Sequence, residues 1–437
     1  MKNILAAISL MATATVAIAE NRIDIIRPDA PELAAYGDLT VGVRELKLVN
    51  SGQPDIANMT FDATEVPRYD RNLTLQVWYP ADKNASGSTT LKVLLRDGHT
   101  VVDLHGKGIV DAQPAGGEAY PLIIMSHGYP GNRFLMSPLA ENIASKGYVV
   151  VSIDHTDTTY DTLKPVTSGL VNRSNDQYFA LDQVAKMAGD RDSFLHGLVD
   201  VDRTAIMGYS LGAYGTLISA GAGLTDAMVY ATEGAWRAPR GMLEQYRNGS
   251  DAYNSRFDDR IKTAITFAPA GFNMGAFDKH TMKSLRVPTL FIAGSRDDVV
   301  GYEDGVRETW QAATGVDRAL LTFIGANHNV GAPMAPPAEA WTYDPYLKMN
   351  LAAHYVDFVW DNVRMNNISA HFVTAWLDYR LKSEKAKADY MDLTPNSEDG
   401  VWNLDGKTPN AAHTYWKGFP KRSAQQLQFE TKLAKEK

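Results

Sequence analysis

The sequence predicts an α/β fold, in which a mostly parallel sheet has an antiparallel N-terminal edge and helices on both faces. Two observations predict it. Near-continuous apolar runs recur after Tyr120, as strands buried on both faces of a parallel sheet do. Helical stretches separate several of these runs, and right-handed crossovers of this kind place helices on both faces of a sheet.

The segment before Tyr120 has a different pattern. Residues 38–50 and 71–80 alternate apolar and polar side chains, and the second run stops at a proline, which is typical of antiparallel strands. Residues 85–108 are expected to form a loop followed by a hairpin. We expect all these strands to build the antiparallel edge of the same sheet.

Six apolar runs predict the parallel part of the sheet. Helices are expected over 136–147 and 175–189, and a long amphipathic helix over 346–363 closes the core. The runs are residues 120–128, 147–154, 203–210, 262–270, 287–295 and 319–325.

A single insertion, at about 221–260, interrupts this alternation and could form a short cap over a site. It is rich in arginine and aromatic residues. Its aromatic side chains could line an apolar pocket or pack against the body of the protein, and we favour packing. These aromatic residues are Tyr230, Trp236, Tyr246 and Tyr253.

The composition is that of a globular protein without disulfides. The chain has 437 residues, a net charge of −8 and no cysteine, so nucleic-acid binding, a thiolate nucleophile and a thiolate metal site are not expected. Residues 1–19 combine Lys2, an apolar stretch and small residues at 17 and 19, the pattern of a secretory signal peptide. We expect cleavage before Glu20, no transmembrane span, and export to a bacterial periplasm or the medium.

A serine between two glycines ends the third apolar run. Ser210 stands between Gly208 and Gly212 in the pattern G-x-S-x-G, and ligands of open α/β sheets bind at the carboxyl ends of strands. A sharp strand–turn–helix strains the serine backbone there, and side chains two residues before and after it would collide with neighbouring segments. The pattern predicts a nucleophile elbow, the alternative being an ordinary turn serine.

A serine hydroxyl needs a base, and the base needs a carboxylate that orients it. In this architecture the acid and then the histidine follow the serine, each on a loop after a later strand. Asp297 and His328 follow the last two apolar runs in that order. Asp298 is the competing acid. His155 also follows a strand but precedes Ser210, against the expected order.

Acyl transfer also requires donors for the developing oxyanion. The residue after the nucleophile supplies one amide, and the loop after an earlier strand supplies the other. Leu211 follows Ser210, and Tyr129 follows the His127–Gly128 turn. We therefore expect the backbone amides of Tyr129 and Leu211 to form the oxyanion hole and His127 to be structural.

The blocks "LTLQVWYP", "PLIIMSHGYPGNR", "GYVVVSIDH", "GYSLGAYG" and "GSRDD…GANH" together resemble the α/β-hydrolase branch that contains platelet-activating-factor acetylhydrolase and bacterial dienelactone-hydrolase-like proteins. The resemblance covers about residues 38 to 385. It implies a serine carboxylester hydrolase with Ser210, Asp297 and His328 as the triad. Dienelactone hydrolases proper use a cysteine nucleophile, which this chain lacks, so their substrate is not carried over.

The resulting hypothesis is a secreted serine hydrolase that cleaves a small-molecule or lipid-like ester through an acyl-enzyme, without cofactor or metal. Residues 20–437 would form one domain with a C-terminal extension from about 390. An amidase or peptidase of the same fold, and a non-catalytic binding protein on this scaffold, are the alternatives. The acyl length, the alcohol and the oligomeric state cannot be read from the sequence.

Overall fold

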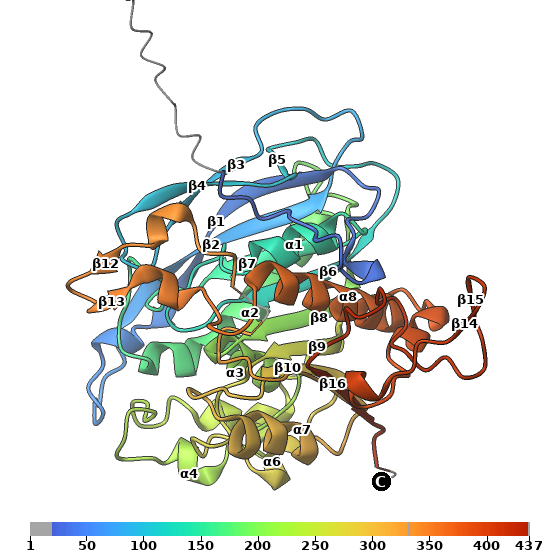
Figure 1. Ribbon diagram of the computed structural model, residues 1–437. Coiled ribbons are helices and arrows are strands. Elements are labelled where there is room, and N and C mark those ends of the chain that lie inside the picture. The colour runs from blue at the N-terminus through green and yellow to red at the C-terminus, as the bar shows by residue number, and fades with distance from the viewer. Residues whose placement is uncertain (1–19, 331–332, 436–437) are drawn as a thin grey trace, which may run out of the picture.

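The computed structural model describes residues 20–330 and 333–435 (Figure 1), so the predicted signal peptide lies outside the described residues. Its centre is a ten-stranded sheet with the order β16-β11-β10-β9-β8-β6-β7-β2-β1-β5. The strands are β1 (Val41–Pro54), β2 (Arg68–Pro80), β5 (Ile109–Val110), β6 (Tyr120–Ser126), β7 (Val149–Asp154), β8 (Val199–Tyr209), β9 (Ile261–Phe267), β10 (Thr289–Gly294), β11 (Arg318–Phe323) and β16 (Leu427–Lys432).

The six strands β6 to β11 are parallel to their neighbours among themselves, whereas β2 pairs antiparallel with β7 and with β1. Every residue of β6, β10 and β11 is buried, because these strands are covered on both faces. The predicted mostly parallel sheet with an antiparallel N-terminal edge is confirmed.

Helices cover the sheet in two groups (Figure 1). Helices α1 (Ser137–Ala144) and α8 (Asn362–Leu381) contact each other, and α2 (Thr167–Gly189) contacts α3 (Leu211–Ser219). Within residues 20–330 and 333–435, no helix has the length and apolar character needed to cross a membrane. The shorter helices are α4 (Asp226–Val229), α5 (Asp251–Asn254), α6 (Lys279–Met282) and α7 (Glu308–Ala312).

The hairpin expected over 85–108 forms, but it does not join the main sheet. Strands β3 (Thr90–Leu94) and β4 (Val101–His105) form a separate two-stranded sheet. Among the described residues, only the short strand β5 pairs with the outer side of β1, at Gly42 and Val43. The hairpin instead buries its alternate side chains, Leu91, Val93, Val102 and Leu104, against the core.

The C-terminal extension adds a strand that sequence analysis does not predict. Strand β16 pairs antiparallel with β11 along the whole length of both strands. Leu427 and Phe429 are buried, and the Phe429 ring stacks on Phe372 of α8 with centroids 4.7 Å apart. The extension therefore belongs to the main sheet, and two small hairpin strands, β14 (Leu404–Asp405) and β15 (Thr408–Pro409), precede β16.

The helix expected over 346–363 is wrong. Its range contains strand β13 (Met349–Asn350), which pairs with β12 (Tyr343–Asp344), then a single 3-10 turn at Leu351–His354 and irregular chain. The α-helix starts only at Asn362. The Asp357 carboxylate accepts the amides of Val359 and Trp360, and Asp361 caps α8 by accepting the Arg364 amide. Short acidic side chains that bind nearby amides compete with helical hydrogen bonding, which delays the helix.

The insertion at 221–260 packs against the body of the protein. Tyr246 and Tyr253 are buried, and their hydroxyls donate to the backbone carbonyls of Val171 and Gly221. Tyr230 is exposed. Trp236 is half-buried, with its ring edge-on to Tyr214 of α3 at a centroid distance of 6.0 Å. Packing, which we favoured for these aromatic residues, is therefore what three of the four do.

Candidate active site

Ser210 occupies a strained turn between β8 and α3. Its backbone has φ 54° and ψ −116°, a region that side-chain-bearing residues rarely adopt. A Cβ at Gly208 would lie 2.3 Å from the Gly212 carbonyl oxygen, and one at Gly212 would lie 2.3 Å from the carbonyl oxygen of Ser126. Glycine is therefore required on both sides of the serine, as the elbow pattern predicts.

The structure brings Ser210, His328 and Asp297 into one hydrogen-bonded chain. His328 Nε2 lies 2.9 Å from Ser210 Oγ, and His328 Nδ1 lies 2.8 Å from Asp297 Oδ2. The Asp297 side chain is fully buried, whereas 12% of the His328 side chain is exposed. A carboxylate on Nδ1 leaves Nε2 unprotonated and able to accept the serine proton.

Asp297, rather than the competing Asp298, faces the imidazole. The second oxygen of Asp297 accepts the amides of Val299 and Val300, each at 3.0 Å, so both carboxylate oxygens have partners. Asp298 is exposed. The turn after β10 thus orients the first aspartate inward and the second outward.

Contacts that sequence analysis missed hold the His328 loop. Asp357 accepts the backbone amide of Asn327. The Asn329 amide group donates to the carbonyls of Ala353 and Val356, and it accepts the Tyr209 hydroxyl at 3.0 Å. The segment found in place of the expected helix therefore holds the loop that carries the His328 imidazole. Asp357 lies thirty residues from its partner, and no local motif links the two.

Two backbone amides flank the serine. Leu211 is the first residue of α3, and Tyr129 follows Gly128, where a Cβ would meet Tyr209 at 3.0 Å and Ser210 at 3.3 Å. The loop after β6 therefore runs directly against the nucleophile elbow. Neither the Tyr129 nor the Leu211 N–H donates to another group of the described residues, so both remain able to bind an oxyanion.

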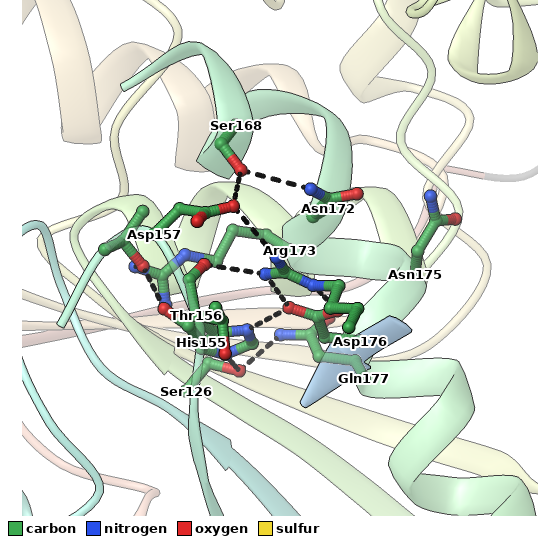
Figure 2. Close-up of polar contacts among 12 residues, drawn as sticks. Ser126, His155, Thr156, Asp157, Ser168, Asn172, Arg173, Asn175, Asp176 and Gln177 are labelled. Atoms are coloured by element: carbon green, nitrogen blue, oxygen red, sulfur yellow. Dashed lines mark hydrogen bonds and ion pairs between the residues drawn. The ribbon is translucent and has the colours of Figure 1, made fainter. Parts of the chain in front are cut away.

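A second Ser–His–Asp set lies in the core of the protein (Figure 2). His155 Nε2 lies 3.0 Å from Ser126 Oγ, and His155 Nδ1 lies 2.9 Å from Asp176 Oδ2. All three residues are at most 1% exposed, so no substrate can reach Ser126. Burial, with the charge of Arg173, lowers the pKa of His155 to about 3, which keeps this imidazole neutral. The set resembles a triad in composition but is part of the core.

One group of side chains outside this site could offer three ligand atoms to a metal. The ligand atoms of Asp97, His99 and Asp344 lie within 4.8 Å of one another. Asp97 already accepts the amides of His99 and Thr100, and Asp344 accepts the amides of Tyr346 and Leu347. These carboxylates complete local turns.

The order of the strands and the strand–turn–helix at Ser210 are those of the α/β-hydrolase fold. Residues 93–239 match the family model of PET hydrolase-like proteins. A ferulic acid esterase from Streptomyces cinnamoneus has a similar structure, with a TM-score of 0.53 and 17% identity over 92% of this chain and 99% of that chain, which shows the shared fold.

Curated relatives lie among cutinases. Cutinase 2 from Thermobifida cellulosilytica is 28% identical over 216 residues, which cover 49% of this chain and 63% of that protein. Cutinase est2 from Thermobifida alba is 36% identical over 216 residues, which cover 49% of this chain and 55% of that protein. The chain thus matches between about half and two thirds of the length of these relatives. The more specific resemblance to platelet-activating-factor acetylhydrolase and dienelactone-hydrolase-like proteins stays a prediction.

Proposed function

We propose that the protein is a serine hydrolase that cleaves carboxylic esters through an acyl-enzyme. The observation that supports this most directly is the continuous hydrogen-bonded chain from Asp297 through His328 to Ser210. The amides of Tyr129 and Leu211, which have no partner among the described residues, lie on the two segments that meet at this serine. A hydroxyl with an adjacent base and two oriented donors has the parts needed for acyl transfer.

In the proposed mechanism, Ser210 Oγ attacks the ester carbonyl carbon while His328 Nε2 takes the hydroxyl proton. The carbonyl oxygen becomes an oxyanion, which accepts hydrogen bonds from the N–H groups of Tyr129 and Leu211. Collapse of this intermediate expels the alcohol, which takes the proton from His328. Water then gives a proton to His328 and attacks the acyl group, and the acid leaves as Ser210 recovers its proton. Asp297 holds the imidazole in the tautomer that each step needs.

The relatives indicate the class of ester. Their names describe cutinases, PET hydrolase-like proteins and a ferulic acid esterase, whose common chemistry is hydrolysis of esters. We infer that the substrate here is a small-molecule or lipid-like ester. We also retain, as parts of the proposal, one catalytic domain over 20–437 and export directed by residues 1–19.

The test combines turnover with active-site labelling. Native protein and Ser210→Ala are assayed on p-nitrophenyl esters of increasing acyl length and treated with a fluorophosphonate probe. We expect native turnover and labelling, and a decrease in kcat of about 10⁴-fold or more in Ser210→Ala with no labelling. Native-like turnover by Ser210→Ala would refute the assignment.

Ser126→Ala is the matched control, because Ser126 belongs to the other Ser–His–Asp set. Its hydroxyl is fully buried, so the probe should still label the variant. Loss of labelling in folded Ser126→Ala, together with labelling retained in Ser210→Ala, would identify Ser126 as the nucleophile and refute the assignment of Ser210.

A further inference from the structure

A fully buried arginine lies directly behind the loop that supplies one oxyanion donor. Arg173, on α2, has no solvent exposure. Its guanidinium donates to the carbonyls of His127 at 2.8 Å and Gly128 at 2.9 Å, and to Thr158 Oγ1 at 2.9 Å. Two of these three hydrogen bonds hold the turn between β6 and Tyr129, and the third ties the guanidinium to the segment after β7.

Close packing places the arginine there. A Cβ at Gly215 of α3 would lie 2.6 Å from the Cβ of Arg173, so α2 and α3 approach closely at this level. The same helix α3 begins at the nucleophile elbow. Arg173 therefore lies between the helix that follows Ser210 and the loop that faces it.

The Gly128–Tyr129 peptide connects this arginine to catalysis. The Gly128 carbonyl accepts Arg173 and also His127 Nδ1 at 2.7 Å. His127 can donate from Nδ1, because its Nε2 accepts the His155 amide. In a trans peptide the C=O and the following N–H point in opposite directions. Holding this carbonyl therefore points the Tyr129 N–H away from the guanidinium, and the peptide lies against the elbow, since a Cβ at Gly128 would be 3.3 Å from the Cβ of Ser210.

Charge strengthens the same effect. Two buried carboxylates lie near this arginine, those of Asp157 and Asp176, and both form ion pairs with Arg71 rather than with Arg173. Burial lowers the pKa of Arg173 to about 9, which leaves it charged at neutral pH. A cation bound to a peptide carbonyl polarises that peptide, and its N–H becomes a stronger donor in a medium of low dielectric constant.

We propose that Arg173 is a positioning residue for the oxyanion hole, which orients and polarises the peptide whose N–H belongs to Tyr129. This inference rests on the proposed function, because the oxyanion exists only in the ester-hydrolysis cycle. The forked guanidinium is needed, since it binds two successive carbonyls at once, whereas a lysine ammonium is a point charge.

The test compares Arg173→Met and Arg173→Lys with native protein. An oxyanion donor acts in the tetrahedral state and not on bound substrate. We therefore expect kcat of Arg173→Met to fall about 10- to 100-fold with KM within about twofold. The inhibition constant of a phenylboronic acid, which forms a tetrahedral serine adduct, should rise in parallel. Arg173→Lys should recover part of both losses.

Arg318→Met is the matched control. Arg318 is also buried and donates only to backbone carbonyls, those of Trp310, Val316, Gln311 and Leu433, but it begins β11, away from the elbow. We expect lower stability with kcat within about twofold of native.

Two results would overturn the role of Arg173: kcat within about threefold of native in folded Arg173→Met, or an equal loss of kcat in Arg318→Met. If Arg173→Met does not fold, Arg173→Lys decides, and native kcat and boronate affinity in that variant would refute the proposal. Native protein that neither hydrolyses esters nor reacts with the fluorophosphonate probe would refute the proposed function itself, and this inference with it.

Discussion

Replacing Gly212 with alanine tests how closely the nucleophile elbow packs against the oxyanion loop. The added Cβ would lie 2.3 Å from the Ser126 carbonyl oxygen and 2.6 Å from the His127 carbonyl oxygen. Both atoms are backbone atoms at the end of β6, so no side chain can rotate away to relieve the contact.

The size of the effect follows from this geometry. The closer contact is roughly 1 Å shorter than ordinary van der Waals separation, and overpacking of this kind costs about 1–3 kcal/mol of unfolding free energy. Because backbone must move, we expect a value near 3 kcal/mol. Relief requires α3 to separate from the loop that carries the Tyr129 amide, and a displacement of about 1 Å in a catalytic group costs about 100-fold in kcat.

Steady-state hydrolysis of p-nitrophenyl acetate and denaturant unfolding measure the two effects. Gly189→Ala is the control, since Gly189 ends α2 and a Cβ there would meet no atom within 4 Å. That variant should keep its kcat and gain up to about 1 kcal/mol of stability. Gly212→Ala with native kcat and native stability would refute the claim that the loop and the elbow are in fixed contact.

Three further predictions concern other parts of the molecule. Asp297→Asn should lower kcat about 10⁴-fold by favouring the wrong imidazole tautomer; ester turnover within tenfold of native would contradict this. Burial lowers the pKa of His155 and His371 to about 3, below the unfolded value of about 6.5. The unfolded state therefore binds protons first, and each histidine should reduce the unfolding free energy by about 1.4 kcal/mol per pH unit as pH falls from 6.5 toward 3. Denaturant titrations at pH 7, 6 and 5 measure this, and a flat profile would argue against neutral buried histidines. Phe429→Ala should lower the unfolding free energy by about 3–5 kcal/mol, because it removes the ring that stacks on Phe372. Its kcat should stay native below the unfolding transition. Gln428→Ala is the control, and an equal loss of unfolding free energy in the two variants would exclude a packing cause.

The sheet and the three residues of the proposed triad could be predicted, because the sequence patterns that indicate them are local. Burial on both faces demands unbroken apolar runs, and the turn that presents Ser210 demands small residues at fixed offsets. Asp297 and His328 then followed from their positions after later strands in a fixed chain order. The structure brings these three side chains together, while their catalytic roles stay predictions.

The supports of the site could not be predicted, because each depends on contacts between distant segments. Arg173 meets Gly128 from a helix that begins 39 residues later in the chain, and the predicted helix started only at residue 175. Amphipathic periodicity favoured a helix over 346–363, but the Asp357 side chain binds amides of its own segment and of the His328 loop. Likewise, no local sequence pattern predicts that β16 pairs with β11.

The position of β16 has a consequence for proteolysis and aggregation. Strand β11 consists of six buried residues, Arg318–Phe323, and residues 427–432 occupy its outer side. A chain clipped before residue 427 would present a row of unpaired peptide groups on an apolar strand, a template for pairing between molecules. By pairing with β11, strand β16 therefore protects the protein against self-association through β11.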